Sequence, residues 1–399
     1  MLKESLFNPK KLPKEAEDVL KNFDSIIQGI LPLNSRQISK LPDDIRELSH
    51  QLTDERDTRR TAYMNEKVTL SAYTRYFMWW NLVRLTRLFS NIDVSKVNIN
   101  DGDACIDLGS GPLTAVIALW LSRPELRSLN ITWYCVDISP TALSLGEDLF
   151  LSVAARTLTE EMENKWKIIR VKGQMGTSIK QKAKLLICAN MFNEVFQSES
   201  RPLDFLAKKY SEDLMHYGDK ETSYLVIEPG IPRSARFISL LRDTFIRKGM
   251  AITAPCSHCE TCPMDGRLLK GPHMNRTPDS GRTGKWCNFA FPVKNAPEKL
   301  QKLSAAAKIP KERVVLSFVF ATPKADSEKQ FDGKSILLRI ASDPIRLKDK
   351  IGFYACSELG LVLYIPKKGQ LTFSGDLVEV PLPKREPKKD FKSGAIIIE

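Results

Sequence analysis

Several features that would place this protein at a membrane or outside the cell are missing from its sequence. It contains no run of about 18 consecutive apolar residues, the length that a membrane-spanning helix needs. Its first residues, Met1–Ser5, lack the apolar stretch of a signal peptide. Acidic residues near this end argue against an organelle presequence: Glu4, Glu15, Glu17 and Asp18. We therefore expect a cytoplasmic protein that does not contact a membrane.

Cysteine is scarce, with eight residues in 399, and five of them fall late in the chain. In a reducing compartment, clustered cysteines indicate metal ligands before disulfides. Cys256, Cys259 and Cys262 follow one another at a spacing of three, Pro263 comes next, and Cys287 lies further on. Because C-x-x-C spacing lets two sulfur atoms reach one centre from a single turn, spacing alone predicts these four cysteines as ligands. Four thiolates suit either an iron–sulfur cluster or zinc.

Acidic residues are outnumbered, with 48 Asp and Glu against 60 Lys and Arg, which gives a net charge of +12 and a pI near 9.2. A polyanionic partner, most simply nucleic acid, is the expected consequence. Basic residues with an aromatic residue among them are suited to bind phosphates and stack a base. The candidates are Lys270, His273, Arg276, Arg282, Lys285 and Trp286 in the cysteine loop, and Arg339, Arg346, Lys348 and Lys350 beyond it.

The order of the expected elements divides the chain into parts. Residues 1–100 show a helical pattern broken by prolines, and residues 101–324 alternate apolar strands with helices. Such alternation predicts a parallel, doubly wound α/β sheet. A long loop at 255–295 holds the cysteines, and a bound metal centre would account for its length. Residues 325–380 predict a small OB-like β module, and 381–399 a flexible tail rich in proline and lysine.

A glycine loop lies between the first strand and the first helix of the α/β part, in the run Asp107-Leu-Gly109-Ser-Gly111-Pro. Glycines at this place permit a ligand to approach the backbone at a helix N-terminus. An acidic residue two positions before G-x-G resembles the first motif of S-adenosylmethionine-dependent methyltransferases. Asp107 would then accept hydrogen bonds near the methionine ammonium group. Asp137, at the end of the next strand, would accept them from the ribose hydroxyls.

Two further strand ends complete the candidate cofactor site, since ligands of such sheets bind at the carboxyl ends of strands. Gln174 follows the third predicted strand, and Asn190 follows the fourth. Signatures of catalysis are missing. The sequence has no N-P-P-Y motif of amide or adenine methylation, no cysteine pair placed for attack on a base, and no C-x-x-x-C-x-x-C motif of radical enzymes. Cofactor binding is therefore better supported than catalysis, and the catalytic residues stay unknown.

Several motifs, taken together, resemble one family. They are Tyr63 with Leu70–Tyr73, Asp107–Pro112, Phe192–Glu194, Glu228–Gly230, Ala254–Cys256, Cys262–Pro263 and Trp286–Phe289. From about residue 60 to about residue 365, the chain is similar to the mitoribosomal small-subunit methyltransferase-like assembly factors and their bacterial relatives. The cysteine motifs and the glycine loop carry most of the specificity of this resemblance.

The resemblance implies a Rossmann-like seven-strand class I methyltransferase fold, S-adenosylmethionine as cofactor, a 4Fe–4S cluster, and binding to small-subunit ribosomal RNA during ribosome assembly. The cluster ligands that it implies are Cys256, Cys262, Cys287 and Cys356, the last of which precedes a turn glycine in the β module. Cys259 then departs from the pattern. Zinc remains an alternative, with His258 or His273 as a possible further ligand.

Two functions stay open from the sequence. One is a monomeric binding protein that kept the methyltransferase fold and engages the small ribosomal subunit. The other is an active S-adenosylmethionine-dependent methyltransferase of ribosomal RNA. The glycine loop with Asp107 and Asp137 permits the second function, while the missing catalytic signature favours the first.

Overall fold

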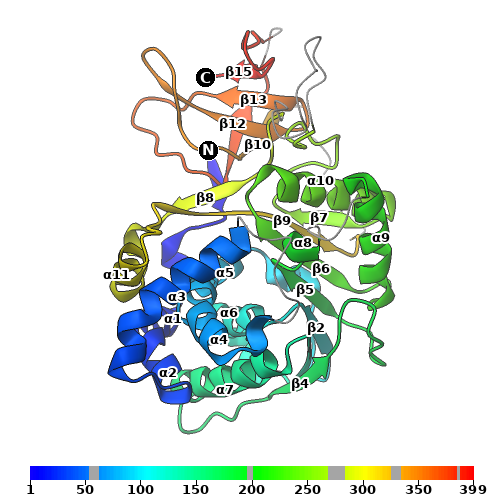
Figure 1. Cartoon of the computed structure of the whole chain (residues 1–399). Coiled ribbons are helices and arrows are strands. Elements are labelled where there is room, and N and C mark those ends of the chain that lie inside the picture. The colour runs from blue at the N-terminus through cyan, green and yellow to red at the C-terminus, as the bar shows by residue number, and fades with distance from the viewer. Residues whose placement is uncertain (54–62, 196–200, 268–283, 325–333, 384–386) are drawn as a thin grey trace.

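The computed structural model describes residues 1–53, 63–195, 201–267, 284–324, 334–383 and 387–399. Two sheets organise these residues. A body of strands and helices forms the lower part of Figure 1, and a smaller β module lies above it. Both ends of the chain lie at this β module (Figure 1).

The larger sheet has the strand order β4-β3-β2-β5-β6-β9-β7, and β8 also pairs with β9. The strands from β4 to β6 are parallel, and β9 is antiparallel to β6, β7 and β8. The bounds are β2 (Ala104–Leu108), β3 (Ile131–Asp137), β4 (Trp166–Lys172), β5 (Leu185–Ala189), β6 (Ser223–Pro229), β7 (Ala251–Ala254), β8 (Phe289–Pro292) and β9 (Arg313–Thr322). This order confirms the predicted Rossmann-like α/β fold. The strand order reverses between β2 and β5, which is where such sheets bind ligands.

Helices cover both faces of the larger sheet, in two separate apolar cores. One face carries the N-terminal helices and those that follow β2 and β3: α1 (Lys14–Lys21), α2 (Phe23–Ile30), α3 (Ser35–Thr53), α4 (Lys67–Ala72), α5 (Trp79–Phe89), α6 (Thr114–Ser122) and α7 (Pro140–Thr157). Every residue of α6 is buried, as expected for a helix that is apolar on all sides. The opposite face carries α8 (Phe192–Val195), α9 (Leu203–His216) and α10 (Pro232–Arg247).

The N-terminal helices are joined to the sheet by one long helical segment. A π-helical stretch, Tyr73–Met78, continues α4 directly into α5. From this segment the indole Nε1 of Trp79 donates to the carbonyl of Leu20 in α1 at 2.9 Å, and that of Trp80 donates to Ser304 in α11 (Glu298–Ala306) at 3.1 Å. The N-terminal region therefore packs as part of the body.

The C-terminal module is a mainly antiparallel sheet of order β1-β14-β10-β12-β13-β15, with β11 paired to β12. Its strands are β1 (Leu2–Ser5), β10 (Ser335–Ile340), β11 (Ile345–Arg346), β12 (Ile351–Ser357), β13 (Gly360–Tyr364), β14 (Asp376–Pro381) and β15 (Ile396–Ile398). Two strands come from regions for which the sequence predicted something else. β1 belongs to the range expected to be helical, and β15 pairs in parallel with β13 inside the range expected to be a flexible tail.

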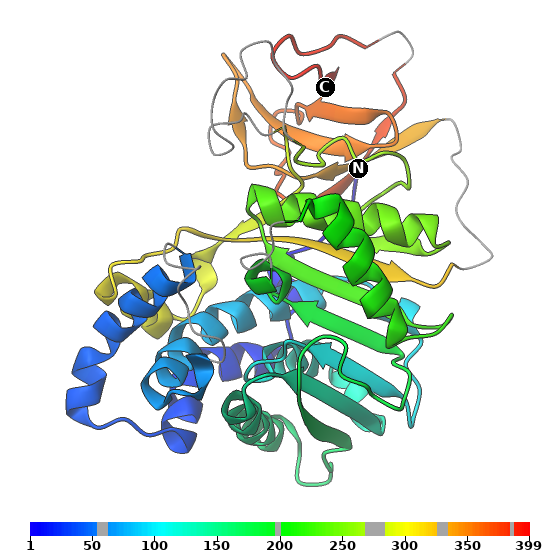
Figure 2. The same ribbon diagram turned by 45° about the vertical axis from the view of Figure 1, so that its right-hand side comes forward.

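Figure 2 shows the C-terminal module lying beside α10 and above the β7–β9 side of the larger sheet. The loop that leaves β7 runs upward into this junction (Figure 2). Across the described ranges of the chain, no helix is both long enough and apolar enough to cross a membrane.

Candidate functional site

The glycine loop follows β2 at the point where the strand order reverses. The backbone N–H groups of Gly109 and Ser110 both donate to the carbonyl of Val136 in β3, at 2.9 and 3.1 Å. Gly109 and Gly111 have φ angles of +69° and +50°, which glycine adopts without steric cost. On the helix side the loop is fixed by α7, because a Cβ atom on Gly146 would lie 2.5 Å from the carbonyl carbon of Pro112.

Asp107 lies at the base of this loop and is 1% exposed. Its Oδ2 atom is buried and has no hydrogen-bond partner. Burial raises the pKa of this carboxyl group to about 8; a hydrogen bond with Ser110 opposes the shift, and the nearby Asp137 adds to it. A buried, unpartnered carboxylate oxygen costs stability unless a cation or a donor meets it. Asp107 therefore fits the expected acceptor of a ligand ammonium group.

Asp137 differs from Asp107 because both of its carboxylate oxygens already accept backbone hydrogen bonds. Oδ2 accepts from the N–H of Gly111 at 2.8 Å, and Oδ1 accepts from the N–H of Ser139 at 2.8 Å. Burial raises the pKa of Asp137, while these hydrogen bonds lower it. The residue holds the glycine loop against α7, and a ribose would share oxygen atoms that the backbone already uses.

Met191 lies directly over the glycine loop. The Cβ and Cγ atoms of its side chain are each 2.8 Å from the place where a Cβ atom of Gly109 would stand. Only glycine at position 109 therefore fits beneath Met191. A ligand that approached the backbone at this point would have to displace the side chain of Met191.

Asn190 and Gln174, the other predicted cofactor residues, lie at the same edge of the sheet as the buried Glu228, which was not predicted. Asn190 follows β5 with φ +62°, and its Oδ1 accepts from the Nη2 of the buried Arg84 at 2.8 Å. Glu228 in β6 is 0% exposed and accepts from the backbone of Phe192 and Asn193, both at 2.9 Å. Burial raises its pKa to about 8, and the backbone bonds and Arg84 oppose the shift. Gln174 follows β4 and is exposed.

The second candidate centre lies between the body and the C-terminal module. Cys256 and Cys262 belong to the loop after β7, Cys287 precedes β8, and Cys356 lies in β12. Burial raises the pKa of Cys356 well above its usual value, and the neighbouring thiolates of the other three raise it further. The pKa of Cys287 is raised by burial and then by Cys262 and Cys256. The fold thus brings these four cysteines into one electrostatic neighbourhood.

Cys259 does not share this neighbourhood to the same extent. Its side chain is exposed, whereas Cys262 and Cys356 are buried and Cys256 and Cys287 are partly buried. Its charge affects the pKa of Cys256 only as the last of five causes. All eight cysteines are free thiols. Among the residues that the structure describes, no three His, Cys, Asp or Glu side chains form a group that could hold a single metal ion.

A buried arginine from α10 faces the cysteines. Arg242 is 3% exposed; its Nε donates to Cys256 Sγ at 3.1 Å, and its Nη2 donates to the carbonyls of His258 and Glu260 at 2.9 and 2.8 Å. Burial lowers the pKa of Arg242, but Cys256, Cys262 and Asp243 together raise it by more, so the pKa lies above its usual value. Such a cation stabilises thiolates over thiols, which is the form that binds metals.

A second buried arginine, Arg339 in β10, corrects one sequence expectation. The sequence pattern predicts Arg339 as part of a basic surface that binds nucleic acid, but its side chain is 2% exposed. Its guanidinium donates to the carbonyl of Pro255 at 2.6 Å and of Gly375 at 2.7 Å, and it pairs with Glu4 in β1. Arg339 therefore ties the cysteine loop to the module instead of facing a partner.

His258 also contacts the centre. Its Nε2 lies 2.8 Å from Cys356 Sγ, while its Nδ1 is buried without a partner. Burial, followed by the charge of Arg242, lowers its pKa to about 4, so the ring is neutral near pH 7. Of the basic and aromatic residues expected to bind nucleic acid in the cysteine loop, the structure describes Lys285 and Trp286. The others lie outside the described residues: Lys270, His273, Arg276 and Arg282.

Sequence reasoning missed the role of Arg242 entirely. Arg242 lies on the buried side of α10, four residues after the buried Ile238, and its local sequence gives no sign of its partner. The chain's path from α10 through β7 into the next loop places it at Cys256, 14 positions later. The buried position of Arg84 beside Asn190 and Glu228 was likewise visible only in the fold.

Comparisons with known proteins add a family. A family model described as mitochondrial small ribosomal subunit Rsm22 matches residues 67–362. No curated protein matches the chain.

Solved methyltransferases resemble parts of the chain. One from Geobacter sulfurreducens in complex with S-adenosyl-L-homocysteine is 10% identical, with a TM-score of 0.31 over 61% of this chain and 90% of that chain. An RNA methyltransferase candidate from Pyrococcus horikoshii is 12% identical, with a TM-score of 0.32 over 74% of this chain and 100% of that chain. These TM-scores are too low for the matched structures to bear on function.

Proposed function

Because the chain belongs to the Rsm22 family of the mitochondrial small ribosomal subunit, we propose that it is a methyltransferase-like, iron–sulfur-containing protein that binds small-subunit ribosomal RNA. In this role it acts during ribosome assembly or translation, in a cytoplasmic compartment. The net charge of +12 supports an RNA partner, because it favours association with a polyanion.

The observation that carries the proposal is the meeting of four cysteines from distant segments. Cys256 and Cys262 lie in the loop after β7, Cys287 precedes β8 and Cys356 lies in β12. The guanidinium of Arg242 donates to Cys256, and His258 contacts Cys356. Four thiolates are the ligand set of a 4Fe–4S cluster, and hydrogen bonds to the sulfurs tune such clusters. A cluster held by these four residues would add a covalent link between the body and the C-terminal module.

The test is the metal content of the protein purified without oxygen. We expect a brown protein with about four iron atoms and equivalent acid-labile sulfide per chain. Cys356→Ser should lose most of both, whereas Cys259→Ser, the matched control on the exposed cysteine, should keep them. Stoichiometric zinc, with neither iron nor sulfide, would show that the four cysteines form a zinc site and not an iron–sulfur cluster. Equal loss in both variants would contradict the proposed ligand set.

A second candidate function, an active S-adenosylmethionine-dependent rRNA methyltransferase, is favoured by Asp107. Its unpartnered Oδ2 suits the ammonium group of the cofactor, which when bound supplies the methyl group. Calorimetric titration with S-adenosylmethionine tests this role. If the function holds, the wild type binds and Asp107→Asn weakens binding about tenfold or more, because one charge-assisted hydrogen bond is lost. If S-adenosylmethionine does not bind to the wild type, the methyltransferase function is excluded.

A variant of Met191 tests the same cofactor site in the same calorimetric titration. Since its side chain covers Gly109, Met191→Ala should open the glycine loop and tighten cofactor binding without removing a polar contact. An unchanged affinity in Met191→Ala would mean that the cofactor does not approach the loop at Gly109.

A further inference from the structure

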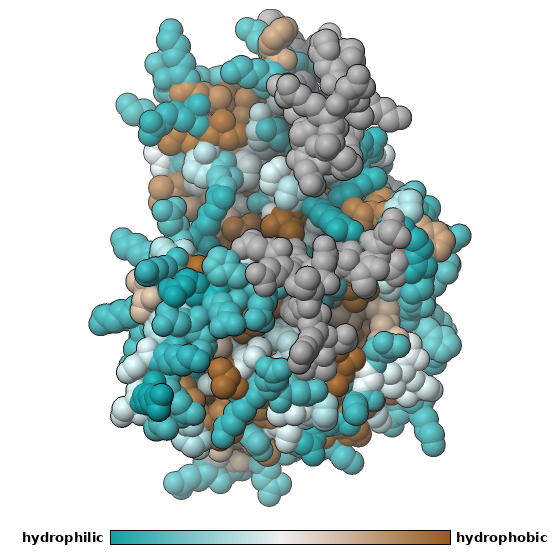
Figure 3. All heavy atoms as spheres, in the orientation of Figure 1, coloured by the Kyte–Doolittle hydropathy of each residue, from teal (hydrophilic) through white to brown (hydrophobic). Residues whose placement is uncertain are grey.

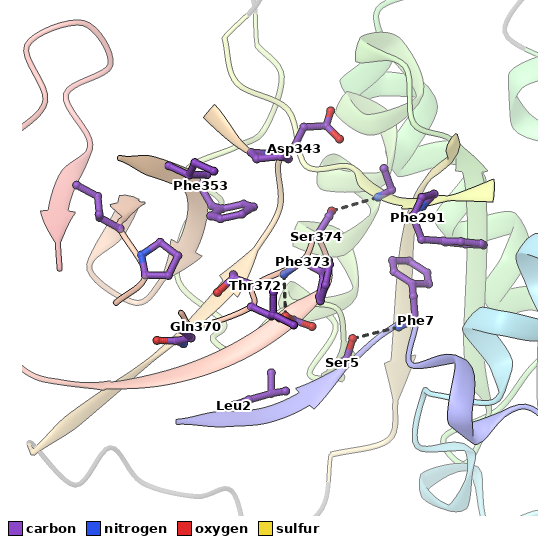
Figure 4. Close-up of a pocket in the computed structure, with 18 of the residues that line it drawn as sticks. Leu2, Ser5, Phe7, Phe291, Asp343, Phe353, Gln370, Thr372, Phe373 and Ser374 are labelled. Carbon is purple, nitrogen blue, oxygen red and sulfur yellow. Dashed lines mark hydrogen bonds between the residues drawn. The ribbon is translucent and has the colours of Figure 1, made fainter. Parts of the chain in front are cut away.

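A large cleft lies between the C-terminal module and the body, away from the glycine loop. Its volume is about 1950 Å³, and its walls come from β1, the segment around β8, the β10–β12 connection, and the loop after β13. Figure 4 shows Phe7, Phe291 and Phe353 lining it together with the loop residues Thr372 and Phe373. Ordinary small-molecule pockets hold roughly 300–1,000 Å³, so this cleft is large enough for a segment of a polymer.

The charge of the cleft is positive. Eight Lys and Arg side chains line it, against five Asp and Glu. Two of the acids are neutralised in ion pairs, Asp343 with Arg313 and Glu399 with Lys350. The basic side chains that line it without an ion pair or hydrogen bond in the described structure are Lys294, Arg346, Lys348, Lys367 and Lys368, and all five are exposed. A lining of this kind is complementary to a chain of phosphates.

The loop after β13 presents apolar and polar groups between these cations. Phe373 is 56% exposed and Leu371 is 79% exposed, although both are large apolar side chains. Between them, Thr372 is 9% exposed, and its Oγ1 is buried without a hydrogen-bond partner. The loop itself is held in place, because Asp376 Oδ2 accepts from the N–H of Phe373 at 2.8 Å. An aromatic ring is thus presented to solvent on a fixed backbone.

Figure 3 shows hydrophobic side chains gathered on the C-terminal module on this side of the molecule, framed by hydrophilic ones. Apolar surface between basic side chains is the composition of single-strand binding grooves, where bases stack on aromatic rings and cations follow the backbone. A purely acidic protein segment would use the cations but would leave the exposed ring of Phe373 without a purpose.

We propose that this cleft binds a single-stranded RNA segment, with phosphates on the five unpaired cations and a base stacked on Phe373. The proposal rests on the proposed function, which it deepens by naming the surface and the form of the RNA. The cleft is also joined to the cysteine centre, because Arg339 donates both to Pro255 beside Cys256 and to Gly375 at the end of the cleft loop.

The experiment is a fluorescence anisotropy titration of the full-length protein with a 12-nucleotide oligouridine, about the site size of one OB-like module. Phe373→Ala should weaken binding about five- to one-hundred-fold, the range that loss of one base-stacking contact gives. The triple variant Arg346→Gln, Lys367→Gln, Lys368→Gln should make the slope of log K against log salt shallower by about two, at roughly 0.7 per phosphate contact on a single strand.

A matched triple variant removes the same charge elsewhere. Lys165→Gln, Lys167→Gln and Lys180→Gln alter exposed lysines at the β4 side of the body, outside the cleft lining. We expect it to change the salt slope much less than the cleft variant.

The outcomes separate the two proposals. If the wild type binds neither oligouridine nor small-subunit ribosomal RNA, the proposed function falls and the cleft proposal falls with it. If the wild type binds RNA but Phe373→Ala and the cleft triple variant bind as the wild type does, only the cleft proposal is overturned. A polyglutamate peptide of equal charge gives a further test. The cleft proposal is also overturned if this peptide competes as well as oligouridine and if Phe373→Ala changes the affinity for neither, since the cleft is then a site for acidic peptides.

Discussion

Asp107 and Asp137 serve the same glycine loop, but their carboxylates are in different states. Both stand at strand ends, and both were predicted to hold a cofactor. In the fold, Asp137 accepts two backbone N–H groups, whereas Asp107 keeps one buried oxygen without a partner. Asp137 is therefore part of the loop's own structure, whereas the free carboxylate oxygen of Asp107 is available to a ligand. The sequence could not separate them, because backbone donors are not visible as residue types.

The raised pKa of Asp107 gives a prediction on stability against pH. A buried acid whose folded pKa is about 8 binds a proton in the folded state that the unfolded state, with a pKa near 4, has already released. Stability from this residue is therefore lost as the pH rises from about 4 to about 8. Asp107→Asn should remove this loss and be the more stable protein at pH 8, by at most about 5 kcal/mol.

Thermal unfolding of both proteins between pH 4 and pH 9 measures the effect. Asp101→Asn is the control, because hydrogen bonds from Asn130 lower the pKa of the exposed Asp101 and any change in its pH profile falls near or below pH 4. Parallel stability curves for the wild type and Asp107→Asn across pH 4 to 8 would contradict the prediction. Glu228, whose pKa is also raised to about 8, contributes the same sign in both proteins.

At the scale of elements, β1 and β10 decide how the C-terminal module is attached. β1 pairs with β14, more than 370 positions later in the chain, in the register Leu2↔Val378. Arg339 in β10 then joins three segments through Glu4, Pro255 and Gly375. Glu4 lies in β1, Pro255 in the loop after β7 and Gly375 just before β14, so one side chain links two strands of the module to the cysteine loop.

Arg339→Met tests this attachment. Methionine fills a similar volume but leaves the carbonyls of Pro255 and Gly375 without their donor, so we expect a loss of about 3 kcal/mol in the free energy of unfolding. Arg346→Met is the matched control on a neighbouring strand, where the side chain is exposed and a change within about 0.5 kcal/mol is expected. Denaturant unfolding measures both; a similar small loss in the two variants would show that Arg339 does not hold the module.

At the scale of the whole molecule, the cysteine centre lies where the body and the C-terminal module meet. Cys256 and Cys262 follow β7 of the larger sheet, and Cys356 lies in β12 of the smaller one. The apolar core of the body is built mainly from the large sheet and the helices on its faces, and at the junction it also takes in Cys262, Met264 and Ala341. A metal centre here would control how the parts are joined more than whether the body folds.

Removal of the proposed cluster should therefore separate binding from folding. Oxidation or chelation of the anaerobic protein is expected to lower the affinity for small-subunit ribosomal RNA at least tenfold, while amide protection in β2, β5 and β6 remains. Hydrogen exchange should accelerate in the loop after β7 and in β10 and β12, which lose their link. Uniform loss of protection across the large sheet would mean that the cluster supports the whole fold. Unchanged RNA affinity would disconnect the cluster from binding.

Much of the body could be predicted from local patterns. Apolar strands alternating with helices predicted the doubly wound sheet that the structure has. The position of the glycine loop, between the first strand and the first helix of the α/β part, was also predicted. The attachment of the module could not be, because β1, β15 and Arg339 find their partners across the chain and their sequences carry no sign of register.

What the sequence by itself determined is therefore the order of elements, the glycine loop with its two acids, and the presence of a cysteine cluster, because these depend on periodicity and on residue type over short spans. The tertiary structure decided which acid keeps a free oxygen, which arginines are buried beside the thiols, and how Cys356 joins cysteines about a hundred positions earlier. Those facts depend on long-range strand pairing and on burial, which no short stretch of sequence contains.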